Sequence, residues 1–253
     1  MSRYAKILLA LALLAIWQAV CSLGLISPVI VASPINIVRA ATSEWPEFLG
    51  ALGYTSLLIL AGIVGAWGLG IVVGAALGSS ELLARATAPI LSSILAVPLV
   101  VWYPILMVWV GIGAESKIIY GMLSGFFPIA LATLNAVQHY DRRYVTLARA
   151  MGANTVQLFV RFIIPMTLPT IVAGLRVGTA FTVIGIIVAE MLASTAGLGF
   201  LISYYRTMFD TGHVYLGISL ALAITFVINL GLTSLEKHMG RWRSLELSAR
   251  TSR

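Results

Sequence analysis

Six long runs of apolar residues dominate the pattern of the chain. They lie at roughly 7–26, 55–78, 89–110, 117–137, 171–193 and 214–235. A helix needs about 20 predominantly apolar residues to cross about 30 Å of hydrocarbon, and each run reaches that length. No ten-residue segment alternates polar and apolar positions with period two, which disfavours a β-barrel. The pattern predicts an all-α membrane protein of six transmembrane helices, forming a single transmembrane domain over residues 1–253.

The first run has to be distinguished from a secretory signal peptide, because Arg3 and Lys6 precede it. It stays apolar for about 20 residues, whereas the apolar part of a signal peptide has about 7–15. It also lacks a good A-x-A site before Ser27-Pro28. We therefore expect a retained span.

Composition agrees with a chain dissolved in lipid. Apolar residues make up 60% of the 253 positions and charged residues only 10%, against about 45–50% and about 25% in soluble domains. These values exclude an ordinary cytosolic enzyme, a disordered chain and a disulfide scaffold, and the single Cys21 cannot form an internal disulfide.

The net charge of +7 comes from 16 Lys and Arg against 9 Asp and Glu. Six spans place both termini on one side, and 13 of the 16 cations fall on that side. Membrane proteins keep Lys and Arg on the cytoplasmic side, so both termini are expected there. This distribution explains the positive charge without nucleic acid, and the basic tail after Lys237 suits anionic lipid.

The segment from about 138 to 170 is a long, structured cytoplasmic loop. Asp141 is a plausible N-cap for a helix that ends at Gly152, a residue suited to the left-handed C′ position. Asn154 or Thr155 can cap a second short helix, which Pro165 interrupts.

The first loop helix carries an apolar stripe with helical spacing, formed by Tyr144, Leu147, Ala148 and Met151. Two to eight residues would join neighbouring helices, whereas this loop uses about thirty. A short amphipathic helix can dock into a groove of a partner protein. Two readings stay open: partner docking, and an interfacial hairpin that only joins two spans.

The loop resembles the EAA loop of ABC importer permeases, because Pro165 follows Gly152 by thirteen residues and Ala153 follows the glycine. In this resemblance the three EAA positions are Thr146, Leu147 and Ala148. Thr146 stands where the family has Glu, and Leu147 replaces the first Ala.

Further motifs resemble the nitrate/sulfonate/taurine branch of that family. They are Ser33-Pro34, Ala96-Val97-Pro98 through Trp109-Val110-Gly111-Ile112-Gly113, Phe126-Phe127-Pro128, and Ala189-Glu190-Met191-Leu192 through Gly197-Leu198-Gly199. With the loop, they cover roughly residues 28–240.

The resemblance implies a type I importer fold and a permease subunit of the bacterial inner membrane. It implies a second permease copy as a homodimer, two cytoplasmic ATPase subunits docked on the loop, and a periplasmic binding protein that delivers a small, anionic solute. Solute identity is not readable from the sequence.

The sequence predicts no catalysis by the chain itself. No G-x-x-x-x-G-K-[ST] motif occurs, since the three lysines follow Ala5, Ser116 and Glu236. We expect no cofactor and no metal, because His139 and the other two histidines are widely separated and no H-E-x-x-H is present.

Five residues are candidates for the solute pathway or its gate. Glu190 is the only acid inside a predicted span, and such residues mark function by default; a structural contact with a neighbouring helix is the alternative. Pro98 and Pro104 interrupt the third run around Trp102 and Tyr103, so this span is expected to bend. A bend that only serves packing is the alternative there.

Small residues repeat every four positions along the second run, at Gly62, Ala66, Gly70, Gly74 and Gly78. Such a stripe lets another helix approach closely. A self-sufficient secondary transporter or channel is the alternative function; it would predict more intramembrane charge and often inverted repeats.

Overall fold

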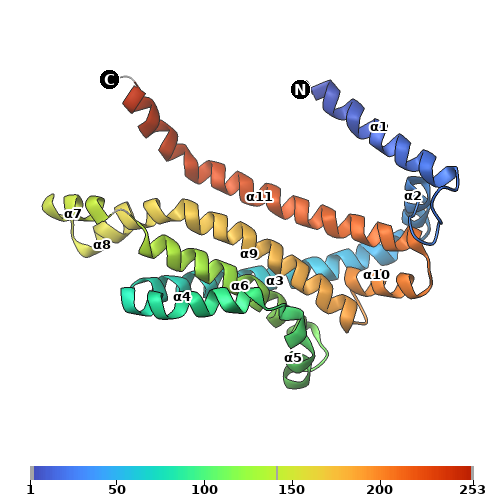
Figure 1. Ribbon diagram of the computed structural model, residues 1–253, viewed down its shortest axis with the longest axis horizontal. Helices are drawn as coiled ribbons and strands as arrows, with labels where there is room; N and C mark the ends of the chain where they lie inside the picture. Colours follow the sequence, from blue (N-terminus) through green and yellow to red (C-terminus); the bar gives the residue numbers. More distant parts are fainter. Residues whose placement is uncertain (1–2, 141, 252–253) are drawn as a thin grey trace. The chain divides into compact units, whose positions relative to one another are not determined.

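The computed structural model describes residues 3–140 and 142–251, and its regular elements in that part of the chain are all helical (Figure 1). The all-α prediction is therefore confirmed. The elements are α1 Arg3–Ser22, α2 Pro34–Ser43, α3 Trp45–Gly78, α4 Glu81–Ala96, η1 Leu99–Trp102, α5 Tyr103–Val110, α6 Ala114–Gln138, α7 Arg142–Ala150, α8 Thr155–Leu158, η2 Phe159–Ile163, α9 Ile164–Leu192, α10 Leu198–Thr207 and α11 Thr211–Thr251.

The chain divides into two compact units. The first unit combines residues 1–57 with 187–224, and the second combines 58–186 with 225–253.

Four segments of the described chain are long and apolar enough to cross a membrane: α3, α6, the stretch Arg161–Leu192 that includes α9, and the stretch Thr211–Ser234 of α11. The bent pair of α4 and η1–α5 would make a fifth. The first predicted run forms α1, whose apolar stretch Ile7–Ser22 is shorter than the four spanning segments. The described helices thus support four or five of the six predicted spans.

The third predicted span, 89–110, is broken. The axes on either side of the break differ by 85°, and Figure 1 shows α5 turned away from α4. The cause is local, since Pro98 has no N–H to continue a helix and disfavours helical backbone at the residue before it. Val97 accordingly has an extended conformation, with φ −88° and ψ 130°. Pro104 is the second residue of α5, where proline is tolerated.

The second unit is built on the small-residue stripe of α3, which packs against α6 and α9. A Cβ at Gly74 would lie 2.5 Å from the carbonyl oxygen of Ala130, and one at Gly62 would lie 3.0 Å from side-chain atoms of Thr182 and Ile186. The stripe is therefore a packing surface, as predicted, and of the two possibilities that the sequence left open, within the chain or across a dimer, these contacts lie within the chain.

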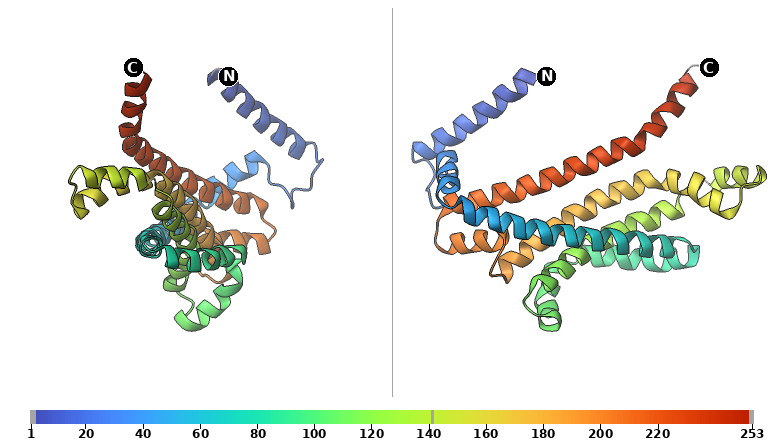
Figure 2. Two further views of the ribbon diagram at one scale, coloured as in Figure 1. Left: turned by 60° about the vertical axis from the view of Figure 1, so that its left-hand side comes forward. Right: turned by 180° about the vertical axis from the view of Figure 1, so that it is seen from behind.

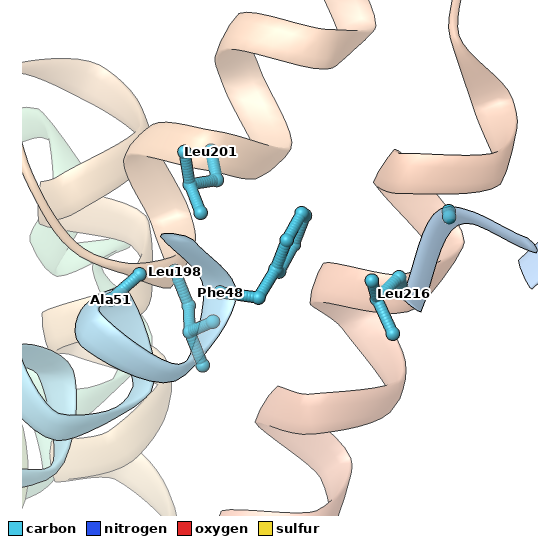
Figure 3. Close-up of a cluster of buried hydrophobic side chains, with 6 residues drawn as sticks. Phe48, Ala51, Leu198, Leu201 and Leu216 are labelled. Atoms are coloured by element: carbon cyan, nitrogen blue, oxygen red, sulfur yellow. The ribbon is translucent and has the colours of Figure 1, made fainter. Parts of the chain in front are cut away.

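In the first unit, Phe48 is completely buried at the centre of a small apolar core (Figure 3). The core joins the start of α3 to α10 and α11 through buried leucines and alanines, which are Ala40, Ala51, Leu198, Leu201 and Leu216. α3 begins ten residues before the predicted span because Pro46 and Glu47 suit the first turn of a helix.

Candidate functional site

The predicted cytoplasmic loop folds into a small hairpin of α7 and α8, which extends from the ends of α6 and α9 (Figure 2). α7 ends in a Schellman motif. Gly152 has φ +82° and its N–H donates to the carbonyl of Arg149 at 2.9 Å, while the N–H of Ala153 donates to the carbonyl of Ala148 at 3.0 Å. Gly152 occupies the left-handed C′ position that the sequence predicted for it.

The second loop helix, α8, begins with a capping box. The N–H of Gln157 donates to Oδ1 of Asn154 at 2.8 Å, and the N–H of Asn154 donates to Oε1 of Gln157 at 3.1 Å. Of the two predicted caps, Asn154 is therefore the one used. The predicted N-cap of the first loop helix, Asp141, lies outside the described residues.

The apolar stripe of α7 divides into an inward and an outward part. Ala148 is completely buried against Leu158 and Ile163, which gives the hairpin its own core. Leu147 is 58% exposed and Met151 is 78% exposed. One face of α7 therefore packs into the hairpin core, while two large apolar side chains of the same helix are exposed.

The other predicted loop residues are placed around this surface. Thr146 is exposed on α7, as are Arg143 and Arg149. Tyr144 belongs to α7, and Ala153 is half-buried. Pro165 is exposed at the second position of α9, so α8 ends before it and a π-helical turn, η2, fills the interval.

The four pathway candidates of the third run meet at the elbow between α4 and α5. Trp102 is 56% exposed, and Pro98 and Pro104 are exposed. Tyr103 differs, because it is completely buried and its ring lies 5.0 Å from that of Tyr120 on α6.

A pocket of about 300 Å³ occupies the inside of this elbow. Its lining is apolar and rich in aromatic rings: Ile94, Val97, Leu99, Trp102, Ile105, Leu106, Trp109, Tyr120, Leu123 and Phe127. The residues of α6 were not singled out by the sequence. Tyr120, Leu123 and Phe127 follow each other at helical spacing, which was the available signal.

Glu190 belongs to the first unit, whereas the elbow belongs to the second. Its side chain is 1% exposed, and its carboxylate accepts hydrogen bonds from the Thr55 hydroxyl and from the N–H of Gly199, each at 2.9 Å. Thr55 was not singled out from the sequence, because it is 135 positions away along the chain, whereas Gly199 belongs to the same quoted motif as Glu190. The predicted residues therefore form three groups: the loop hairpin, the elbow and the Glu190 cluster.

A comparison with protein families matches residues 67–244 to the model described as "Binding-protein-dependent transport system inner membrane component". Among curated relatives, the taurine transport system permease protein TauC of Escherichia coli (strain K12) is 31% identical over 241 residues, covering 91% of this chain and 86% of the relative. The formylaminopyrimidine transport permease protein ThiX of Halalkalibacterium halodurans is 31% identical, covering 92% and 93%. The putative aliphatic sulfonates transport permease protein SsuC of Bacillus subtilis is 28% identical, covering 94% and 87%.

The fold is similar to that of a chain in a solved structure, an inward-facing conformation of the MetNI methionine ABC transporter. The two superpose with a TM-score of 0.66 at 19% sequence identity, covering 77% of this chain and 97% of that chain.

Proposed function

Since this chain belongs to the family of binding-protein-dependent transport system inner membrane components, we propose that it is the permease subunit of an ATP-driven importer whose motor docks on the 138–170 loop. In this proposal two permease copies form a homodimer, and two cytoplasmic ATPase subunits bind their loops. A periplasmic binding protein delivers the solute. The permease does not hydrolyse ATP.

The observation that carries the docking proposal is the outward face of α7. Leu147 and Met151 are exposed on a helix whose C-terminal end is closed by a Schellman motif and whose opposite face is packed through Ala148 into the hairpin core. A preorganised apolar knob of this kind suits a groove on a partner, because little conformational entropy is lost on binding.

The charges around the knob indicate the character of that groove. Arg143 and Arg149 are exposed on α7, and the stripe itself is apolar. The partner surface is therefore expected to be an apolar groove rimmed by carboxylates. Because Thr146 replaces the Glu of the family loop, docking rests on apolar burial rather than on an acidic side chain at that position.

We place the solute pathway and the permease–permease contact at the elbow of α4 and α5. At membrane depth, irregular backbone is tolerated only where protein covers it or where it lines a water-filled cavity. The break at Val97-Pro98 is exposed in the isolated chain, so it is expected to face the second permease copy or the pathway. Trp102 and Trp109, which are 56% and 77% exposed, lie on the same part of the elbow.

The remaining parts of the proposal concern place and cargo. The distribution of Lys and Arg favours a cytoplasmic side for both termini and the loop, and the family description supports a place in the bacterial inner membrane. Relatives named for taurine and aliphatic sulfonates favour a small organic anion as solute.

The test of docking is co-purification of the ATPase with permease variants. Burying one Leu-sized side chain contributes about 1.5–3 kcal/mol, which corresponds to roughly a 10- to 150-fold change in affinity. Leu147→Ser and Met151→Ser are therefore each expected to weaken ATPase association by about tenfold or more, measured by titrating purified ATPase onto permease in nanodiscs.

The matched control is Leu82→Ser, because Leu82 is 79% exposed, belongs to α4 and falls on the same predicted side of the membrane. It should leave ATPase affinity unchanged. Equal affinity for all three variants would contradict docking through α7. Solute uptake by the permease alone, without any ATPase, would favour a secondary transporter instead.

A further inference from the structure

Glu190 stands at an electrostatically unfavourable place in its own helix. It lies in the last turn of α9, which ends at Leu192. The C-terminus of a helix carries partial negative charge, so an acidic side chain there is disfavoured unless another positive group compensates it. The side chain is also almost completely buried, which adds a desolvation cost.

The compensating group is the N-terminus of α10. The N–H of Gly199, in the first turn of α10, donates to Oε2 of Glu190 at 2.9 Å. The N–H of Leu198 donates at 2.8 Å to the Thr55 hydroxyl, and that hydroxyl donates to both carboxylate oxygens at 2.9 Å. Two N–H groups of α10 that have no partner within their own helix are satisfied in this way, one directly and one through Thr55.

Glycine on both sides of Leu198 makes this approach possible. Gly197 has φ +100°, and a Cβ there would overlap the Glu190 carboxylate. A Cβ at Gly199 would overlap the carbonyl oxygen of Ile187. The N–H of Gly199 can therefore reach the carboxylate directly, while the N–H of Leu198 is linked to it through the Thr55 hydroxyl.

We propose that Glu190 and Thr55 form a latch, the Glu190 latch, that fixes the start of α10 to the end of α9 and to α3. Glu190 is then a positioning residue for transport and not a solute ligand, since its carboxylate already accepts from α10 and Thr55. The role of the latch in transport rests on the proposed importer function, whereas its hydrogen bonds do not depend on that function.

The latch fixes the position of α10 relative to the end of α9. α10 carries the half-exposed Tyr204 and the exposed Arg206, and its inner face is anchored by Leu198 and Leu201 in the Phe48 core. With the latch intact, α10 follows any displacement of the end of α9. Without it, the first turn of α10 opens locally, and a force applied to one helix is no longer passed to the other.

The experiment is hydrogen–deuterium exchange of α10 in the permease held in nanodiscs, read on peptides that cover residues 194–203. Thr55→Val removes the hydroxyl at nearly constant volume, and Thr55→Ser keeps it. Losing a hydrogen bond to a charged group shifts an equilibrium by roughly 10- to 150-fold. Thr55→Val and Glu190→Gln should therefore speed exchange of this segment by about tenfold or more, whereas Thr55→Ser should stay within about twofold of the parent chain.

Peptides from α6 serve as the internal reference, because a global loss of stability would speed their exchange equally. Faster exchange confined to residues 194–203 supports the latch. Equal exchange in Thr55→Val and Thr55→Ser, or faster exchange throughout the chain, overturns it. This arm needs no ATPase, so its result is separate from the fate of the importer proposal.

The second readout is ATP hydrolysis by the complete importer, with and without its binding protein. Thr55→Val should keep the basal rate and lose at least half of the stimulation by binding protein, and Thr55→Ser should keep both. Unchanged stimulation in Thr55→Val, with the latch shown to be open, would contradict a role of the latch in coupling. Failure of the unmodified permease to bind the ATPase would instead contradict the importer proposal.

Discussion

Gly74→Ala tests the packing of α3 in the second unit. The added methyl group would lie 2.5 Å from the carbonyl oxygen of Ala130 and 2.7 Å from Cβ of Thr133 on α6. Both neighbours are backbone or backbone-anchored, so the helices must separate, and overpacking of this kind costs about 1–3 kcal/mol. Alanine recovers about 1 kcal/mol through its higher helix propensity. At a contact as short as 2.5 Å the overpacking cost lies at the upper end of that range, so the net loss is about 2 kcal/mol.

Gly68 of the same helix is the matched control, because an added Cβ there has no atom within 4 Å. Gly68→Ala should gain up to about 1 kcal/mol from helix propensity. A change of 1 kcal/mol shifts Tm by about 2–4 °C for a protein of this size, so Gly74→Ala should lower Tm by about 4–8 °C and Gly68→Ala should raise it slightly. Thermal unfolding followed by tryptophan fluorescence measures both. Equal Tm values would refute the assignment of the stripe to α3–α6 packing.

Three further predictions concern local structure. Gly152→Ala should destabilise the loop hairpin by about 1–2 kcal/mol, since alanine is strained at φ +82°; protease cleavage within the loop should speed up correspondingly. Asn154→Ala should cost about 1 kcal/mol through loss of the α8 cap and speed exchange of residues 155–158, while Asn154→Ser should restore most of the protection. Burial and, secondarily, the Glu47 carboxylate raise the pKa of the Tyr205 phenol to about 12. The pKa in the folded chain therefore exceeds the unfolded value near 10. The free energy of unfolding that this shift contributes is present below pH 10 and is lost as pH rises through 12. Tyr205→Phe should therefore show a smaller fall in stability over that interval, measured by denaturation at a series of pH values.

The features that the sequence predicted well are governed by short-range rules. Gly152 and Asn154 act through backbone groups within a few residues, so their caps are readable from the local sequence. The break at Pro98 follows from the missing N–H, and the Gly74 stripe follows from helical spacing. Each needs no knowledge of distant residues.

Two kinds of feature escaped prediction. The start of α4 at Glu81, before the apolar run at 89, is local: Glu81 and Arg85 form an exposed i,i+4 ion pair at 2.7 Å, but a search for apolar runs passes over these polar positions. The other features depend on contacts distant in sequence. The buried state of Tyr103 depends on Tyr120, and the role of Glu190 depends on Thr55. No local pattern encodes these pairings, so the sequence could single out Glu190 without revealing what it binds.

Site-specific cross-linking from α7 tests the central claim of this account most directly. A photoreactive amino acid placed at Met151 is expected to form an adduct with the ATPase subunit, identified as the P-loop protein that co-purifies with the unmodified permease. The same group at Leu82, which is equally exposed, should form none. An adduct from Leu82 but not from Met151, or none from Met151 in an intact complex, would contradict docking of the motor on this helix.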